Sequence, residues 1–125
     1  MISGIGIDIV EISRLKQALA RHPDTFSTKV FTDQELALAG KRSDPNPFLA
    51  GRWAAKEALA KALGCGLGPD CGWTEIEVVN QQNGRPEMKL LGRAAQFAAT
   101  RGVSNIQVSI SHEKHYACAV VVLES

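Results

Sequence analysis

FLAGRWAAKEALAKALG, residues 48–64, is the stretch that decides the fold, because it has the local features of one long helix. We expect Asn46 to cap its N-terminus and Pro47 to occupy the first helical position, where the missing N–H would have been unpaired anyway. Alanine and leucine dominate the interior, and Gly64 suits the left-handed residue just past a helix end. The chain is therefore expected to be organised around this helix.

Charged side chains fall on two sides of the predicted helix. Glu57 and Lys61 lie one turn apart on a face of alanines, whereas Arg52 and Lys56 lie near an apolar side. The alanines are Ala50, Ala54 and Ala58, and the apolar side consists of Phe48, Leu59 and Leu63. A surface helix would keep its charges on one side. This distribution predicts a helix that lies between a hydrophobic core and a polar pocket.

Length and composition predict a single domain over residues 1–125 with a real core, since 45% of the residues are hydrophobic. The net charge is +1, from 14 Lys and Arg against 13 Asp and Glu, so no strong field favours nucleic acid or membrane. No apolar run approaches the roughly 20 residues of a membrane span. We expect a cytoplasmic protein whose cysteines, Cys65, Cys71 and Cys118, are reduced.

The N-terminal residues 2–10 alternate as a strand does, with Ile5, Ile7 and Ile9 on one face. The opposite face consists of Gly4, Gly6 and Asp8. Glycines in a strand allow another part of the chain or a ligand to approach the backbone closely. The pattern places a carboxylate at the end of such a face.

The remaining chain reads as short helices followed by strands. A capping box at Thr32 and Glu35 indicates one helix start, and Gln81 to Gly84 has the composition of a hairpin turn. Helices are expected over residues 11–21, 24–30, 32–40 and 94–101, and strands over 74–80, 85–91, 105–112 and 116–123. Partial segregation of helices and strands indicates an α+β fold, a mainly antiparallel sheet packed against the long central helix.

Asp8 and Glu57 are the candidate metal ligands. A carboxylate on a glycine-lined strand and one on an alanine-lined helix could meet where the two elements pack, and two carboxylates are a usual way to hold Mg²⁺. The residues alone also allow two plain structural roles. Asp8 could cap the following helix, and Glu57 could form an i,i+4 ion pair with Lys61.

Other candidates have a structural alternative of the same kind. Arg52, Lys56 and Lys61 would suit a polyphosphate, but long basic side chains also line helix edges. Arg14 and Arg21 form a local basic ridge, which is either solvated surface or a docking site for an acidic helix. Gly4 and Gly6 lack the third glycine of a dinucleotide-binding fingerprint, so that function is rejected.

Taken together, four motifs resemble the bacterial type of holo-acyl-carrier-protein synthase. They are GIGIDIVEISRL (4–15), FLAGRWAAKEALAKALG (48–64), NGRP (83–86) and VSISH (108–112). The resemblance covers nearly the whole chain, and the order of the acidic strand and the Lys-Glu helix makes it specific. It favours the functional role for Asp8 and Glu57 over the structural one.

The resemblance implies a Mg²⁺-dependent transferase that moves the 4′-phosphopantetheine arm of coenzyme A to a serine of apo acyl carrier protein, releasing adenosine 3′,5′-bisphosphate. Asp8 and Glu57 would hold the metal, and Lys61 would stabilise the departing phosphate. The base is either Glu57 or a metal-bound water. The positions implied to contact coenzyme A are Arg52, Lys56, Lys61, Gly64, Asn83, Gly84, Arg85, Pro86, Ser111 and His112.

The resemblance also implies a homotrimer with each site between two subunits, and an acidic carrier that docks on Arg14 and Arg21. Two departures matter. Asp24 stands where some relatives have a basic residue, and some relatives lack a Ser-His pair, which ranks His112 below the acids.

Two other functions are alternatives to the transferase. One is a non-catalytic module that binds an acidic partner. The other is another Mg²⁺ phosphoryl-transfer enzyme such as a nuclease, for which the chain has no general basic footprint.

Overall fold

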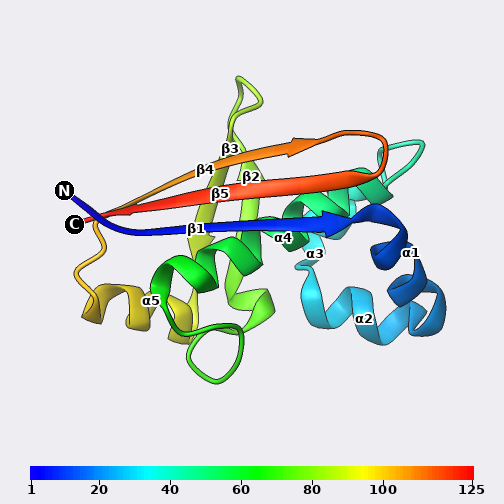
Figure 1. Cartoon of the computed structure of the whole chain (residues 1–125). Coiled ribbons are helices and arrows are strands. Elements are labelled where there is room, and N and C mark those ends of the chain that lie inside the picture. The colour runs from blue at the N-terminus through cyan, green and yellow to red at the C-terminus, as the bar shows by residue number, and fades with distance from the viewer.

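A three-stranded antiparallel sheet covers one side of the central helix (Figure 1). In this computed structural model, which describes all 125 residues, β5 (Tyr116–Glu124) lies between β1 (Ile2–Glu11) and β4 (Asn105–His112). Alternate residues of β5 are buried, as expected of a strand with one face on the core. The buried residues are Ala117, Ala119, Val121 and Leu123.

A separate hairpin is formed by β2 (Ile76–Asn80) and β3 (Pro86–Leu90), which projects away from the body of the molecule in Figure 1. Gly84 in its turn has φ of 85°, a conformation that side-chain-bearing residues rarely adopt. Both predicted hairpins and the α+β class are confirmed. The predicted strand start at residue 74 was too early, because Trp73–Glu75 forms a short 3₁₀ helix, η1.

The central helix α4 runs from Asn46 to Leu63 and ends at Gly64, which has the expected left-handed φ of 79°. The predicted cap was wrong by one residue, since Asn46 is already helical and Pro45 precedes it. Asp44 Oδ1 accepts hydrogen bonds from the backbone N–H and the side-chain amide of Asn46, at 3.1 and 2.9 Å. Because a helix start has unpaired N–H groups, this carboxylate stabilises it.

Four shorter helices surround α4: α1 (Ile12–Arg21), α2 (Pro23–Val30), α3 (Asp33–Ala39) and α5 (Gly92–Thr100). The capping box that the sequence predicted at Thr32 and Glu35 is present. In α1 the apolar side is inward, with Ile12 and Leu15 buried and Arg14 exposed. No helix is both long and apolar enough to cross a membrane.

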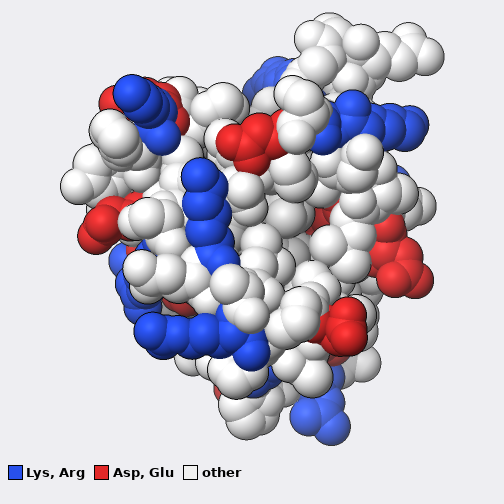
Figure 2. Space-filling view, turned by 90° about the vertical axis from the view of Figure 1, so that its right-hand side faces the viewer, with Lys and Arg blue, Asp and Glu red and all other residues white.

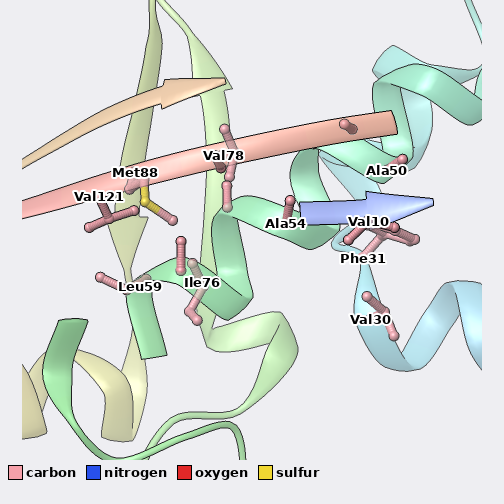
Figure 3. Packing of buried hydrophobic residues seen from close by; sticks show 14 of the residues in the cluster. Val10, Val30, Phe31, Ala50, Ala54, Leu59, Ile76, Val78, Met88 and Val121 are labelled. Carbon is pink, nitrogen blue, oxygen red and sulfur yellow. The ribbon is translucent and has the colours of Figure 1, made fainter. Parts of the chain in front are cut away.

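The core is one continuous cluster of 24 buried residues centred on α4 (Figure 3). Alanines on α4 let the sheet approach closely, and Leu59 lies among Ile76, Met88 and Val121 from the strands. Phe31 and Val10 fill the opposite end beside Ala50. The sheet and the hairpin therefore share one core, and α4 is held on several sides.

Glu75 stabilises the start of α5 from outside that helix. Its carboxylate accepts hydrogen bonds from the N–H groups of Gly72, at 2.8 Å, and Arg93, at 2.7 Å, and these bonds lower the pKa of Glu75. We expect Glu75→Gln to lower the free energy of unfolding by about 0.5–1 kcal/mol at pH 7. Because the pKa of Glu75 is lower in the folded protein than in the unfolded chain, ionised Glu75 stabilises the fold at pH values above the unfolded pKa. This stabilisation is lost as the pH falls through the folded pKa. Urea unfolding should therefore show the difference closing as the pH falls below about 4.

Candidate active site

Glycines on β1 let that strand lie directly against α4. A Cβ on Gly6 would stand 1.9 Å from the carbonyl oxygen of Ala58, and one on Gly4 would stand 2.5 Å from that of Ala62. No side chain fits in that space. The close approach that the sequence predicted for the glycine face is therefore made by the helix itself, and Asp8 follows at its end.

Lys61 bridges the two elements at this point. Its Nζ donates to Asp8 Oδ1 and to the Ile7 carbonyl oxygen, both at 3.1 Å. Neither structural alternative occurs, because Lys61 forms its ion pair with Asp8 rather than Glu57, and no side chain caps α1. Two of the three predicted catalytic residues are thus in direct contact across 53 positions of sequence.

Glu57 joins them from α4. Burial raises the pKa of Glu57, and the negative charge of Asp8 raises it further, while Lys61 and Arg14 act in the opposite direction. Two carboxylates that repel each other at one place gain from a shared cation, and they leave open positions for water and phosphate oxygens. The chain has no cluster of three or more metal-binding side chains. Two carboxylate donors with open positions beside them are a donor set that suits Mg²⁺.

Arg14 lies close to this group of residues. Its guanidinium carbon is 5.9 Å from the centroid of the Trp53 ring, and Trp53 is one turn before Glu57 on the same face of α4. Arg14 and Arg21 are both exposed on α1. Figure 2 views the end of the molecule where α1 and α2 lie, where basic side chains stand among uncharged and acidic ones. The basic ridge is local, as the near-zero net charge requires.

A basic cavity of about 510 Å³ lies on the opposite side of α4. Arg52 lines it with its guanidinium carbon 3.9 Å from the centroid of Phe48, and its Nη2 donates to Asn80 Oδ1 at 3.0 Å. Arg42 stacks on the same ring at 4.2 Å. Burial lowers the pKa of Arg52 to about 10, and Arg52 Nε is buried without a hydrogen-bond partner. Two guanidinium groups on one ring, Arg42 and Arg52, make this side of α4 suited to an anion.

The structure brings some of the late-motif residues to this cavity. Gly84, Pro86 and His112 line it together with Arg52. Arg85 points elsewhere, into a neighbouring cavity, where its Nη2 donates to Gln107 Oε1 at 2.6 Å. Three predicted residues lie outside the cavity lining and are exposed: Gly64, Asn83 and Ser111.

Lys56 lies apart from both groups. Its side chain is fully buried, and its Nζ donates to Glu35 Oε1 at 2.6 Å and to the carbonyl oxygens of Val30 and Trp73. Burial lowers the pKa of Lys56, and the charge of Glu35 partly offsets this effect. With all three donors in use inside the protein, Lys56 is not among the residues that can reach a bound phosphate.

The acid pair and the basic cavity are separated within one chain. Lys61 follows Arg52 by nine residues, which places the two on opposite sides of a helix that turns roughly 100° per residue. Asp8 is on the β1 edge of the sheet, whereas Ile110 and His112 of the cavity are on the β4 edge, with β5 between. A ligand that fills the cavity on one side of α4 is thus turned away from the acids of the same chain.

Residues 4–121 match the sequence model of the 4′-phosphopantetheinyl transferase superfamily. The chain belongs to this superfamily. A holo-[acyl-carrier-protein] synthase of Moorella thermoacetica is 50% identical over 120 residues, which cover 96% of this chain and 92% of that protein. The crystal structure of the Neisseria meningitidis holo-[acyl-carrier-protein] synthase superposes with a TM-score of 0.93 at 32% identity, and each chain is covered completely.

A related structure carries a ligand. The holo-(acyl-carrier-protein) synthase of Bacillus anthracis, in complex with CoA (3′,5′-ADP), has a TM-score of 0.84 and 38% identity, covering 100% of this chain and 98% of that one. Similarity of this level over the full length shows that the fold is shared throughout. The resemblance that the four motifs indicated is confirmed.

Sequence reasoning missed Arg42, Asn80 and Glu35. Arg42 lies in the loop KRSDPNP, whose turn-forming composition gave no reason to single it out. Asn80 ends β2, and only its bond to Arg52 marks it. Glu35 was recognised as a helix cap, and nothing local indicated that the same carboxylate also pairs with a lysine 21 positions later.

Proposed function

We propose that this protein transfers the 4′-phosphopantetheine moiety of coenzyme A to a serine hydroxyl of apo acyl carrier protein. The observation that carries the proposal is the meeting of Asp8, Glu57 and Lys61 at the contact of β1 with α4, in a member of this superfamily. The serine oxygen forms a bond to the β-phosphorus, the one that bears the pantetheine arm. The pyrophosphate P–O bond breaks, and adenosine 3′,5′-bisphosphate leaves.

Each of the three side chains has a role in this displacement. Asp8 and Glu57 would hold Mg²⁺, which would neutralise charge on the pyrophosphate. Lys61, which is exposed beside Asp8, donates to the departing phosphate. Glu57, whose carboxylate lies at the same place, is our candidate for the group that takes up the serine proton.

The basic cavity is our candidate for the nucleotide end of coenzyme A. Arg42 and Arg52 supply the positive charge that attracts phosphate oxygens. The cavity and the acids of one chain lie on opposite sides of α4, so we propose that a bound coenzyme A extends from the cavity of one subunit to the acids of its neighbour. This is the homotrimer with shared sites that the resemblance implies.

The outer face of the sheet supports such an assembly. Ile5, Ile7 and Ile9 point away from α4 and remain 66–69% exposed. Large apolar side chains grouped on one strand face mark an interaction surface. Covering this face with other copies of the chain would bury them beside the acid-bearing strand.

We propose that the carrier docks on Arg14 and Arg21 of α1, and we expect Arg14→Glu to raise the KM for apo carrier about tenfold or more. The KM for coenzyme A should stay within about twofold, because Arg14 is not among the residues that line the nucleotide cavity. Steady-state kinetics with each substrate varied in turn checks this. Arg101→Glu is the matched control, since Arg101 also stacks on a ring, Phe97, at 4.7 Å, on distant α5. An unchanged carrier KM in Arg14→Glu would rule out this docking ridge.

Mass spectrometry of the carrier tests the proposed function. Apo carrier, coenzyme A and Mg²⁺ are incubated with the protein, and a phosphopantetheine-sized mass gain that disappears with EDTA is expected. Carrier binding without any mass gain would instead identify a non-catalytic binding module.

We place the reaction in the cytoplasm, which the three free thiols support, because reduced cysteines persist in reducing compartments.

A further inference from the structure

A buried polar junction lies beneath α4, and the acid pair and the basic cavity do not use it. At its centre Lys56 and Glu35 form an ion pair whose two side chains are both 0% exposed. Lys56 Nζ also donates to the carbonyl oxygens of Val30, at 2.7 Å, and Trp73, at 3.0 Å. The ammonium group thus joins α4 to the last residue of α2 and to η1.

Glu35 extends the junction to two more elements. One of its oxygens accepts from the backbone N–H of Thr32, at 2.9 Å, and the other from that of Val78 in β2, at 2.8 Å. A buried ion pair adds little net stability compared with well-packed apolar residues. The ion pair instead fixes how the elements sit relative to one another, because each partner must stay within hydrogen-bonding distance of a fixed group.

The α1–α2 arm contacts α4 close to the acids. Phe26 of α2 packs edge-on against Trp53, with ring centroids 5.3 Å apart, and Arg14 of α1 lies over the same ring. Trp53 is one turn from Glu57. Because α2 packs on α1 and on the Trp53 ring, the seating of α2 influences where Arg14 stands relative to Glu57. Ile12 and Leu15, which anchor α1 in the core, act together with it.

We propose that Lys56 is a positioning residue: with Glu35 it seats α2 on α4 and so fixes the distance between the carrier-docking arginines and the acid pair. This inference rests on the proposed function, and it assigns Lys56 no contact with either substrate. It predicts that disturbing the junction weakens use of the carrier and leaves use of coenzyme A unchanged.

The double variant Lys56→Met/Glu35→Gln is the test, because either single change would leave a buried charge unpaired and could unfold the protein. Once circular dichroism shows that it is folded, we expect its KM for apo carrier to rise about tenfold, with kcat and the KM for coenzyme A within about twofold of wild type. Leu123→Ala is the control, since it weakens the core in β5 beside Gly4, away from the arm. That variant should keep both KM values.

A second measurement separates positioning from simple loss of stability. Arg14→Glu should raise the carrier KM less in the double variant than in wild type, because the arginine is then already displaced. A wild-type carrier KM in the folded double variant, or full additivity with Arg14→Glu, would overturn the inference. If the wild-type protein transfers nothing, the affinities of wild type and the double variant for apo carrier are compared instead, by titration without coenzyme A. Failure of the proposed function is then distinguished from failure of the positioning role of Lys56.

Discussion

Replacing Asp8 by asparagine should lower kcat/KM for phosphopantetheine transfer at least about 100-fold at millimolar Mg²⁺. Asparagine keeps the size of the side chain and an oxygen near Lys61, but it removes the negative charge that Lys61 now pairs with at 3.1 Å. The same loss is expected for Glu57→Gln. Transfer is measured by the mass of the carrier over a range of Mg²⁺ concentrations, and the variants should need far more metal than wild type.

The stability of Glu57→Gln is the control for this prediction. A raised pKa means that folding disfavours the ionised form of Glu57, so its negative charge lowers the free energy of unfolding at neutral pH. This destabilisation decreases as the pH falls through the folded pKa and is absent below the unfolded pKa. The metal-free variant should therefore unfold at an equal or higher urea concentration than wild type at pH 7, and at the same concentration in acid. If Glu57→Gln keeps full activity at millimolar Mg²⁺, the assignment of Glu57 as a metal ligand is wrong.

The contact between β1 and α4 could be predicted because the local sequence determines both of the surfaces that touch. Glycines at every second position and alanines at every third or fourth describe two faces that can touch, and each face carries one acid. The helix ends were also local, through Gly64 and the box at Thr32. Such features depend on neighbours in sequence, so a single chain is enough to recognise them.

The surroundings of Lys56 and Arg52 could not be predicted in the same way. A lysine at a helix edge usually reaches water, and burial of this one depends on Glu35, which looked like an ordinary cap. Alternation in β1 likewise separated the isoleucines from the glycines without revealing that the isoleucines face outward. Partners distant in sequence decide both outcomes, and they appear only when the elements are packed.

Gly6→Ala should lower the free energy of unfolding by about 3 kcal/mol and also reduce transfer. The new Cβ would lie 1.9 Å from the carbonyl oxygen of Ala58 and 2.8 Å from the backbone nitrogen of Ala62, and because both are main-chain atoms of α4 the strand must move. Asp8, two residues further on, would move with it away from Lys61. Gly40→Ala is the matched control, since Gly40 has a helical φ of −63° and its added Cβ would meet nothing closer than 3.5 Å. Urea denaturation should leave that variant at or slightly above wild type. If Gly6→Ala were as stable as Gly40→Ala, contact between the strand and helix backbones would not be what brings the two acids together.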